Sequence, residues 1–186
     1  MSDRALELIY AVYTDEVGFQ THVKNPCTAA VLTLTTEVCT AASSTRMKVN
    51  SCSASSKLSK AFGCMNAFDG SSEETWATAG QGAGSWIKAN FIATVTKFSY
   101  QHRQSKQKYW NKDIRLEFSD GSTQSYQLKA ESGVQMFTLS KPVTTTFVKI
   151  VVVSHYHKSN NGAREIEFFG CPSDVNERTK KGIHYL

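Results

Sequence analysis

Apolar and polar residues alternate with a period of two along much of the chain. The clearest case is KDIRLEFS (112–119), in which three apolar side chains alternate with charged or polar ones. Such alternation predicts a half-buried β-strand. Asp120-Gly121 follows at once and predicts a tight hairpin turn into a second strand, QSYQL (124–128).

Further short segments show strand-like patterns, and turn residues separate most of them. They are SWIKANFI (85–92), TVTKFSYQH (94–102), VQMFTL (134–139), TFVKIVVV (146–153) and EIEFFG (165–170). A tight corner is expected between the first two, and Pro142 falls in the connection between the next two. One short helix is expected at 57–65. Many short strands with almost no helix predict an all-β sandwich.

Both ends of the chain lie outside this regular pattern. Residues 5–13 fit either a strand or a helical stripe, and the strand is favoured; residues 29–38 are rich in β-branched side chains and predict another strand. The predicted organisation is an N-terminal strand-like extension (1–48), a β-sandwich (49–171) and a C-terminal tail (172–186). We expect the extensions to pair with an edge of the sandwich or to lie on a partner protein.

Two tryptophans flank a glycine-rich loop near the middle of the chain. Trp76 precedes the loop, the loop contains Gly80, Gly82 and Gly84, and Trp86 follows it. Large aromatic side chains dominate the energetics of cores. We therefore expect both rings to be buried anchors beneath a surface loop.

The same region carries a family resemblance. The segments that support it are SASS (53–56), NAFDG (66–70), TW (75–76), WI (86–87), IRLEFSDG (114–121) and REIEFFGC (164–171). In this order they resemble the discoidin domain, a family that includes the C domains of coagulation factors V and VIII and the family 32 carbohydrate-binding modules. The resemblance implies a jelly-roll β-sandwich of eight strands with N-terminal and C-terminal extensions.

The composition suits a globular chain without a membrane span. The chain has 186 residues, 40% of them hydrophobic, which is enough for a core. No apolar run approaches the ~18 residues that a membrane helix needs. Acidic residues interrupt the first apolar segment, as a signal peptide would not, and no Asn-x-Ser/Thr sequon occurs. We expect an intracellular protein, in the cytoplasm, cytoskeleton or cilium; the alternative is an extracellular protein whose signal peptide was removed.

The cysteines bear on the same question. There are five, at positions 27, 39, 52, 64 and 171, with no CxxC pair and no zinc spacing. An odd number without a signal peptide favours free thiols in a reducing compartment. The discoidin resemblance implies instead a disulfide between Cys39 and Cys171, which would leave three cysteines over.

Charge and motifs narrow the function. The net charge is +5, mostly on residues 49–171; it could favour an acidic surface but does not indicate nucleic acid. There is no GxSxG, no HExxH and no phosphate-binding loop. These features predict a binding or structural role rather than an enzyme.

The discoidin resemblance also implies a metal site. Many carbohydrate-binding relatives hold calcium at the positions of Asp69, Thr75 and Glu165, and hard oxygen ligands suit this ion. The family often has a second acidic or amide residue after Asp-Gly, where this chain has Ser71 and Ser72. The alternative is that Asp69 caps its turn by accepting backbone N–H bonds while Glu165 pairs with a nearby cation.

Loops 78–85, 102–112 and 154–162 are the predicted binding loops. The candidate ligand or partner residues on the last two are Arg103, Lys106, Lys108, Tyr109, Trp110, His155, Tyr156 and His157. Basic side chains interleaved with aromatic ones suit sugars, anions or acidic proteins. The alternative is a pair of solvated loops, each with one aromatic side chain turned inward.

Two functions therefore remain open. The favoured one is a non-catalytic protein-interaction or scaffold subunit of a larger intracellular assembly, because discoidin-like folds occur as such subunits in the anaphase-promoting complex and in intraflagellar transport. The alternative is a lectin-like domain that binds glycans, with or without calcium.

Overall fold

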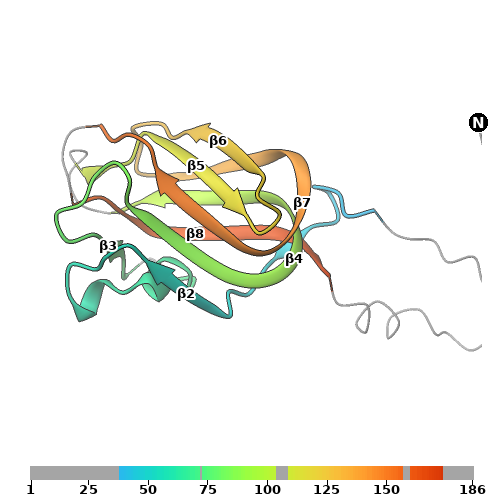
Figure 1. Ribbon diagram of the computed structural model, residues 1–186, viewed down its shortest axis with the longest axis horizontal. Coiled ribbons are helices and arrows are strands. Elements are labelled where there is room, and N and C mark those ends of the chain that lie inside the picture. The colour runs from blue at the N-terminus through green and yellow to red at the C-terminus, as the bar shows by residue number, and fades with distance from the viewer. Residues whose placement is uncertain (1–37, 72, 104–108, 157–159, 174–186) are drawn as a thin grey trace, which may run out of the picture. The chain divides into compact units, whose positions relative to one another are not determined.

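A computed structural model describes residues 38–71, 73–103, 109–156 and 160–173 (Figure 1). The strand expected at 5–13, nearly all of that at 29–38, and the tail from 174 onward lie outside the described residues. The elements are β1 (Thr45–Arg46), β2 (Ser51–Ala54), η1 (Lys60–Phe62), η2 (Cys64–Ala67), β3 (Trp76–Ala77), β4 (Trp86–His102), β5 (Asp113–Phe118), β6 (Thr123–Gln127), β7 (Val134–Val152) and β8 (Gly162–Pro172). The predicted all-β sandwich is confirmed.

Two long strands, β4 and β7, run through both layers of the sandwich. The first part of β4 pairs with β2 and with the second part of β7; from Ala93 onward, β4 pairs with β8 and with the first part of β7. One layer therefore has the order β2-β4-β7-β5-β6, and the other has the order β1-β8-β4-β7, with β3 on β8. Figure 1 shows both strands curving around the core.

These long strands correct two sequence expectations. The tight corner expected between 85–92 and 94–102 is a register shift between Asn90 and Ala93 within one continuous strand. Pro142 does not lie in a connection but inside β7, where pairing with β4 shifts between Thr138 and Val143. Extra residues at such a bulge bend the strand, and they accommodate a proline that has no N–H to donate.

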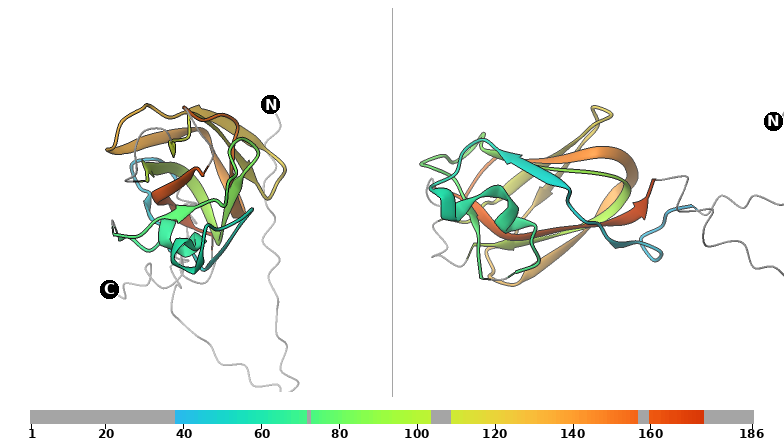
Figure 2. Two further views of the ribbon diagram at one scale, coloured as in Figure 1. Left: turned by 90° about the vertical axis from the view of Figure 1, so that its left-hand side faces the viewer. Right: turned by 90° about the horizontal axis from the view of Figure 1, so that it is seen from below.

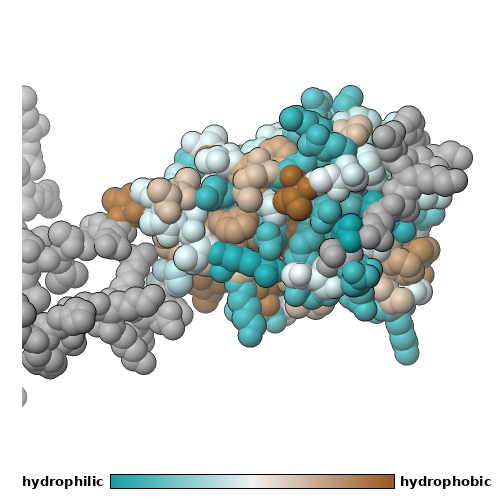
Figure 3. Space-filling view, turned by 180° about the vertical axis from the view of Figure 1, so that it is seen from behind, coloured by the Kyte–Doolittle hydropathy of each residue, from teal (hydrophilic) through white to brown (hydrophobic). Residues whose placement is uncertain are grey.

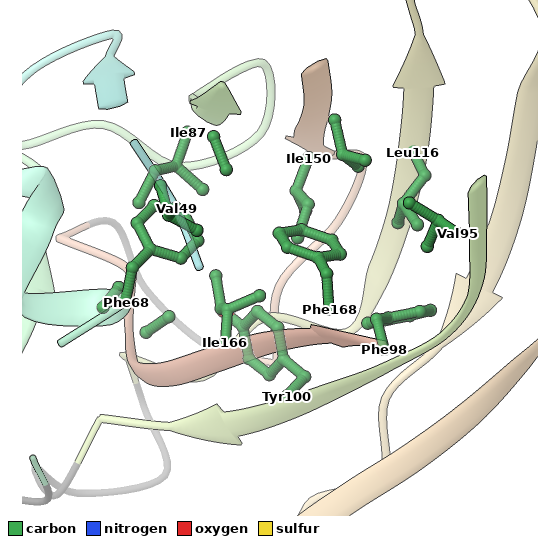
Figure 4. Packing of buried hydrophobic residues seen from close by; sticks show 14 of the residues in the cluster. Val49, Phe68, Ile87, Val95, Phe98, Tyr100, Leu116, Ile150, Ile166 and Phe168 are labelled. Carbon is green, nitrogen blue, oxygen red and sulfur yellow. The ribbon is translucent and has the colours of Figure 1, made fainter. Parts of the chain in front are cut away.

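The core lies between the two layers. Inward-facing residues of β5 alternate as predicted, and Ile114, Leu116 and Phe118 are at most 2% exposed. Figure 4 shows side chains from β4, β5, β7 and β8 packed together, and the rings of Phe91 and Phe168 lie 5.2 Å apart. Burial of this apolar surface is the main stabilising contribution to the fold.

The two tryptophans have different environments. Trp76 is 1% exposed, and its indole N–H donates to the Ser56 carbonyl. Trp86 is only partly buried, because Ile87 beside it points into the core and neighbouring strand residues face opposite sides. The Lys149 ammonium lies 5.4 Å from the centre of the Trp86 ring. The expectation that both rings are core anchors is therefore confirmed for Trp76 and wrong for Trp86.

Two disulfides link segments that are separate in the sequence. Cys39 is bonded to Cys171, and Cys52 to Cys64. The pairing of β1 with β8 brings Cys39 to Cys171, so that residues 38–48, assigned to the extension from sequence, form part of the domain. The expectation of five free thiols is therefore wrong for four of them. Cys27 lies outside the described residues.

Among the described residues, the helical elements are η1 and η2, two short 3-10 turns in place of the single helix expected at 57–65. In the described part of the chain, no helix has the length and apolar character to cross a bilayer.

Candidate functional site

Loops from four parts of the chain meet at one end of the sandwich, which faces the viewer in the left panel of Figure 2. They are residues 55–62, 78–85, the described parts of 103–110, and the described parts of 154–161. The hydroxyls of Ser55 and Ser56 both donate to Oε1 of Gln81, at 2.7 and 2.8 Å. The N–H of Asn160 donates to the Gln81 carbonyl at 2.9 Å. Gln81 thus links three of these loops.

The loop backbones are held in defined conformations. Asn160 has a φ of 68°, a left-handed conformation that asparagine tolerates better than most residues. Its side-chain carbonyl accepts the N–H of Gly80. At Gly82, an added Cβ would lie 2.8 Å from Nε2 of His155, so a larger residue would displace the imidazole. These contacts fix the loop end before any ligand arrives.

A buried polar network supports the loops from below. Oδ1 of Asn161 accepts from the hydroxyls of Thr78 and Ser85, at 2.9 and 3.1 Å. Its Nδ2 donates to the Gly82 carbonyl at 3.2 Å. All three side chains belong to residues at most 2% exposed. A satisfied network of this kind rigidifies the structure around it.

Arg103 contacts residues of three of these loops and is 9% exposed. Its Nη1 donates to the Asn160 carbonyl, and its Cζ lies 5.9 Å from the ring centre of Phe62 and 5.3 Å from that of Tyr109. Burial lowers the pKa of Arg103. Its Nε is buried and has no hydrogen-bond partner among the described residues. The guanidinium is thus held by two ring faces and one carbonyl.

Two of the predicted ligand residues have structural roles. Trp110 is 6% exposed, stacks on His102 with ring centres 4.7 Å apart, and donates from Nε1 to the Arg103 carbonyl. The Tyr156 hydroxyl donates to the Leu128 carbonyl at 2.6 Å. Trp110 matches the alternative in which one aromatic side chain of the loop is turned inward. Trp110 therefore helps to position Arg103, and Tyr156 anchors its loop to Leu128.

The structure places the other predicted residues as follows. Arg103 and Tyr109 lie together, and His155 packs against Gly82 in the adjacent loop. Lys106, Lys108 and His157 lie outside the described residues. Sequence reasoning predicted the loops that carry Gln81 and Asn160 but did not single out these two residues. It did not include the segment that carries Phe62 among the binding loops, because no pattern in that segment indicates a ligand.

The residues predicted to bind calcium form a second cluster, in which each side chain has a partner within the protein. Oδ1 of Asp69 accepts the Ser71 N–H at 2.7 Å, and the Thr75 hydroxyl donates to the Ala163 carbonyl at 2.7 Å. Oε1 of Glu165 accepts the Gly70 N–H at 3.2 Å.

A guanidinium supplies the positive charge in this cluster. Arg46 on β1 reaches Glu165 at 3.4 Å and Glu167 at 2.9 Å, on the outer face of β8. An added Cβ at Gly70 would lie 2.9 Å from either Nη of Arg46. Burial, together with the charge of Asp69, raises the pKa of Glu165 to about 7.

This arrangement does not form the oxygen cage that calcium needs. The contacts correspond to the alternative, with Asp69 capping its turn and Glu165 paired with a cation. No group of three acidic, histidine or cysteine side chains with metal-binding geometry occurs among the residues that the structure describes. Calcium binding at Asp69, Thr75 and Glu165 stays a prediction without structural support.

Some apolar side chains are exposed on the surface of the domain. Val134 and Met136 on β7 are 60% and 54% exposed. Val134 borders a pocket of about 150 Å³ together with Glu165 and Glu167. Figure 3, viewed from behind, shows hydrophobic side chains scattered among hydrophilic ones rather than gathered into a large patch. Single exposed apolar residues of this kind are normal on soluble proteins.

Comparison with solved structures identifies similar folds. The family 32 carbohydrate-binding module of C. perfringens NanJ, in complex with galactose, is 14% identical and has a TM-score of 0.59; the match covers 68% of this chain and 98% of that one. Chitosan-binding module 1 of the Paenibacillus sp. IK-5 chitosanase/glucanase is 22% identical with a TM-score of 0.54, and the match covers 67% and 98%.

A third similar structure is the family 32 module of AlyQ in complex with 4,5-unsaturated mannuronic acid, at 14% identity, a TM-score of 0.54 and coverage of 67% and 98%. No curated protein sequence matches the chain significantly. The sequence matches the F5/8 type C domain over residues 51–168, which is more than half of its length. The chain therefore belongs to the F5/8 type C, or discoidin, domain family.

Proposed function

We propose that this protein is a non-catalytic glycan-binding module. The proposed binding surface, called here the Arg103 site, consists of Phe62, Gln81, Arg103, Tyr109 and Asn160. The observation that carries the proposal is the position of the Arg103 guanidinium beside two aromatic rings, in loops that are already locked together. A preformed set of convergent polar groups beside apolar surface is typical of small-ligand sites.

The chemistry of the Arg103 site suits a sugar. An aromatic face packs against the C–H groups of a pyranose ring, and guanidinium and amide groups exchange hydrogen bonds with its hydroxyls. Gln81 is exposed, and Tyr109 is partly exposed. The similar solved modules support the proposal, because their names describe binding of galactose, chitosan or a mannuronic acid derivative.

Glycan binding replaces the scaffold function favoured from sequence. Neither the comparisons nor the described contacts support a multi-subunit, ciliary or cytoskeletal role. The two disulfides also favour an oxidising compartment, because such bonds persist mainly in secreted and extracellular proteins. We therefore propose that the protein acts outside the cell or in the secretory pathway.

A glycan array with the full chain tests the proposed function. We expect selective binding that Tyr109→Ala and Gln81→Ala weaken about tenfold or more, as loss of a stacking or hydrogen-bonding group would. Phe147→Ala is the matched control, because this ring lies on β7 beside Lys88 and outside the Arg103 site. Absence of glycan binding, or Tyr109→Ala binding like the unaltered chain, would overturn the proposal.

A further inference from the structure

The Arg103 guanidinium has no counter-ion in the described part of the protein. The ion pairs found there involve Arg46, Arg115 and Lys149, and no carboxylate lies within 4.0 Å of Arg103. By contrast, Arg115 on β5 is 42% exposed in its side chain and still pairs with Glu117 at 2.7 Å. The more buried of these two arginines is therefore the unpaired one.

Burial of an unpaired charge has a large free-energy cost. An ionised group in a protein interior is normally paired, since the lost hydration must be replaced. The faces of Phe62 and Tyr109 offer partial compensation through their quadrupoles. The carbonyl of Asn160 uses one of the five guanidinium N–H groups, and Nε remains without a partner in the described structure. An anion bound at this site would therefore supply the counter-charge and the hydrogen-bond acceptors that the guanidinium lacks.

We propose that the Arg103 site selects a sugar that carries a carboxylate, such as a uronic acid or a sialic acid. This inference rests on the proposed glycan-binding function and adds the ligand class. The planar guanidinium fork matches the two oxygens of a carboxylate, and charge-assisted bonds of this type are about twice as strong as neutral ones. The complex of the AlyQ module with a mannuronic acid derivative supports this ligand class for the fold.

Lysine does not replace arginine in this role. The Lys ammonium is a point charge on a flexible stem, whereas the guanidinium presents a rigid pair of N–H groups. The loops fix the orientation of that pair, because Arg103 donates to Asn160 and its own carbonyl accepts from Trp110. The side chain therefore favours an anion of defined shape rather than negative charge in general.

The test compares matched ligands that differ only in the charged group. Isothermal calorimetry with the full, oxidised chain would measure trigalacturonate against its methyl ester, and 3′-sialyllactose against its methyl ester. We expect at least one acidic ligand to bind about tenfold or more tightly than its neutral counterpart, as a charge-assisted hydrogen bond supports. The ligand pair that shows the preference identifies whether the bound carboxylate belongs to a uronic acid or to a sialic acid.

Variants at Arg103 test whether this residue causes the preference for the acidic ligand. Arg103→Gln should abolish the preference for the acid, and Arg103→Lys should retain only part of it. Arg115→Gln, which removes the same charge at a paired position on β5, should leave it unchanged. Because Arg103 is buried, the melting temperature of each variant is measured, and the acid should raise that of the unaltered chain more than the ester does.

The outcomes separate this inference from the function on which it rests. Equal binding of acidic and neutral ligands would overturn the inference while leaving glycan binding intact. Binding of no saccharide would overturn both. Tight binding of dextran sulfate that Arg103→Gln does not weaken would indicate general attraction to a basic surface, and would also overturn the inference.

Discussion

The disulfide between Cys52 and Cys64 joins strand β2 to the turn η2, at the base of the segment that carries Phe62 to Arg103. Ser55 and Ser56 lie in the same closed segment and donate to Gln81. One covalent bond thus constrains several groups that build the Arg103 site. Its removal should affect stability and ligand binding together.

The double variant Cys52→Ser, Cys64→Ser tests this link. Opening a loop of this length is expected to lower the free energy of unfolding by about 2–3 kcal/mol. Glycan affinity should fall as well, because Phe62 and the two serines lose their constraint. Urea denaturation and calorimetry would measure the two effects. Full affinity in the double variant would contradict the proposed coupling. In the unaltered chain, thiol labelling without reductant should find Cys39, Cys52, Cys64 and Cys171 protected.

The two tryptophans provide a matched pair of core and surface rings. Trp76→Ala should lower the free energy of unfolding by ~3–5 kcal/mol, because it empties a fully buried position. Trp86→Ala should cost less than about 2 kcal/mol, since it removes a half-buried ring and one contact with Lys149. Chemical denaturation of both variants would compare them. Equal losses would mean that Trp86 also supports the core.

The strand pattern could be predicted from sequence because it depends on local alternation. The sequence KDIRLEFS and the Asp-Gly turn after it define β5 and the hairpin to β6 without reference to the rest of the chain. The side of the sheet that Trp86 faces could also have been inferred from Ile87 beside it. The general preference of tryptophan for cores outweighed that signal and led to the wrong expectation.

The Arg103 site could be predicted only in part. Arg103 and Tyr109 stood out because basic and aromatic residues alternate in one loop. Phe62, Gln81 and Asn160 come from loops far apart in sequence, and only the folded chain brings them together. The pairing of Arg46 with Glu165 is equally non-local: it depends on β1 lying beside β8.

Calcium should not stabilise the unaltered protein. Arg46 already forms ion pairs with Glu165 and Glu167, and the Thr75 hydroxyl donates to a carbonyl. A thermal melt with about 10 mM calcium, above the dissociation constants of extracellular calcium modules, should match a melt with chelator. The same melts on Arg46→Ala provide a comparison, because that variant frees both carboxylates. A clear stabilisation of the unaltered chain would restore the calcium prediction made from sequence.

Glu165 should make stability fall as the pH rises. Burial raises its pKa from the ordinary value of 4.5 to about 7, with Asp69 adding to the effect and the Gly70 N–H and Arg46 opposing it. Between these two values the folded protein binds more protons than the unfolded chain, so its free energy of unfolding decreases with increasing pH. Within this window the Glu165 carboxyl is mostly neutral in the folded state and mostly ionised in the unfolded chain.

The variant Glu165→Gln isolates this contribution. The stability of the unaltered chain minus that of the variant should decrease from about pH 4.5 to pH 7 and level off above. Glu117→Gln is a control of opposite sign, because hydrogen bonds from Arg115 and Lys149 lower the pKa of Glu117. Urea titrations would measure both differences over a range that extends below pH 4.5, because the contribution of Glu117 changes only there. If the stability of the unaltered chain minus that of Glu165→Gln increased with pH, the folded state would not bind more protons than the unfolded chain, and the prediction would be wrong.

The last prediction concerns where the folded domain begins. The sequence placed its start at residue 49, but β1 pairs with β8, Met47 donates to the Phe168 carbonyl, and Cys39 is bonded to Cys171. A chain starting at Val38 should therefore melt like the full chain. A chain starting at Val49 should lose about 2–5 kcal/mol, mainly through the disulfide. The variant Cys39→Ser, Cys171→Ser would separate the disulfide from the strand pairing. If the chain from Val49 kept full stability, the first strand and its disulfide would contribute nothing to the fold, and the boundary inferred from sequence would be correct.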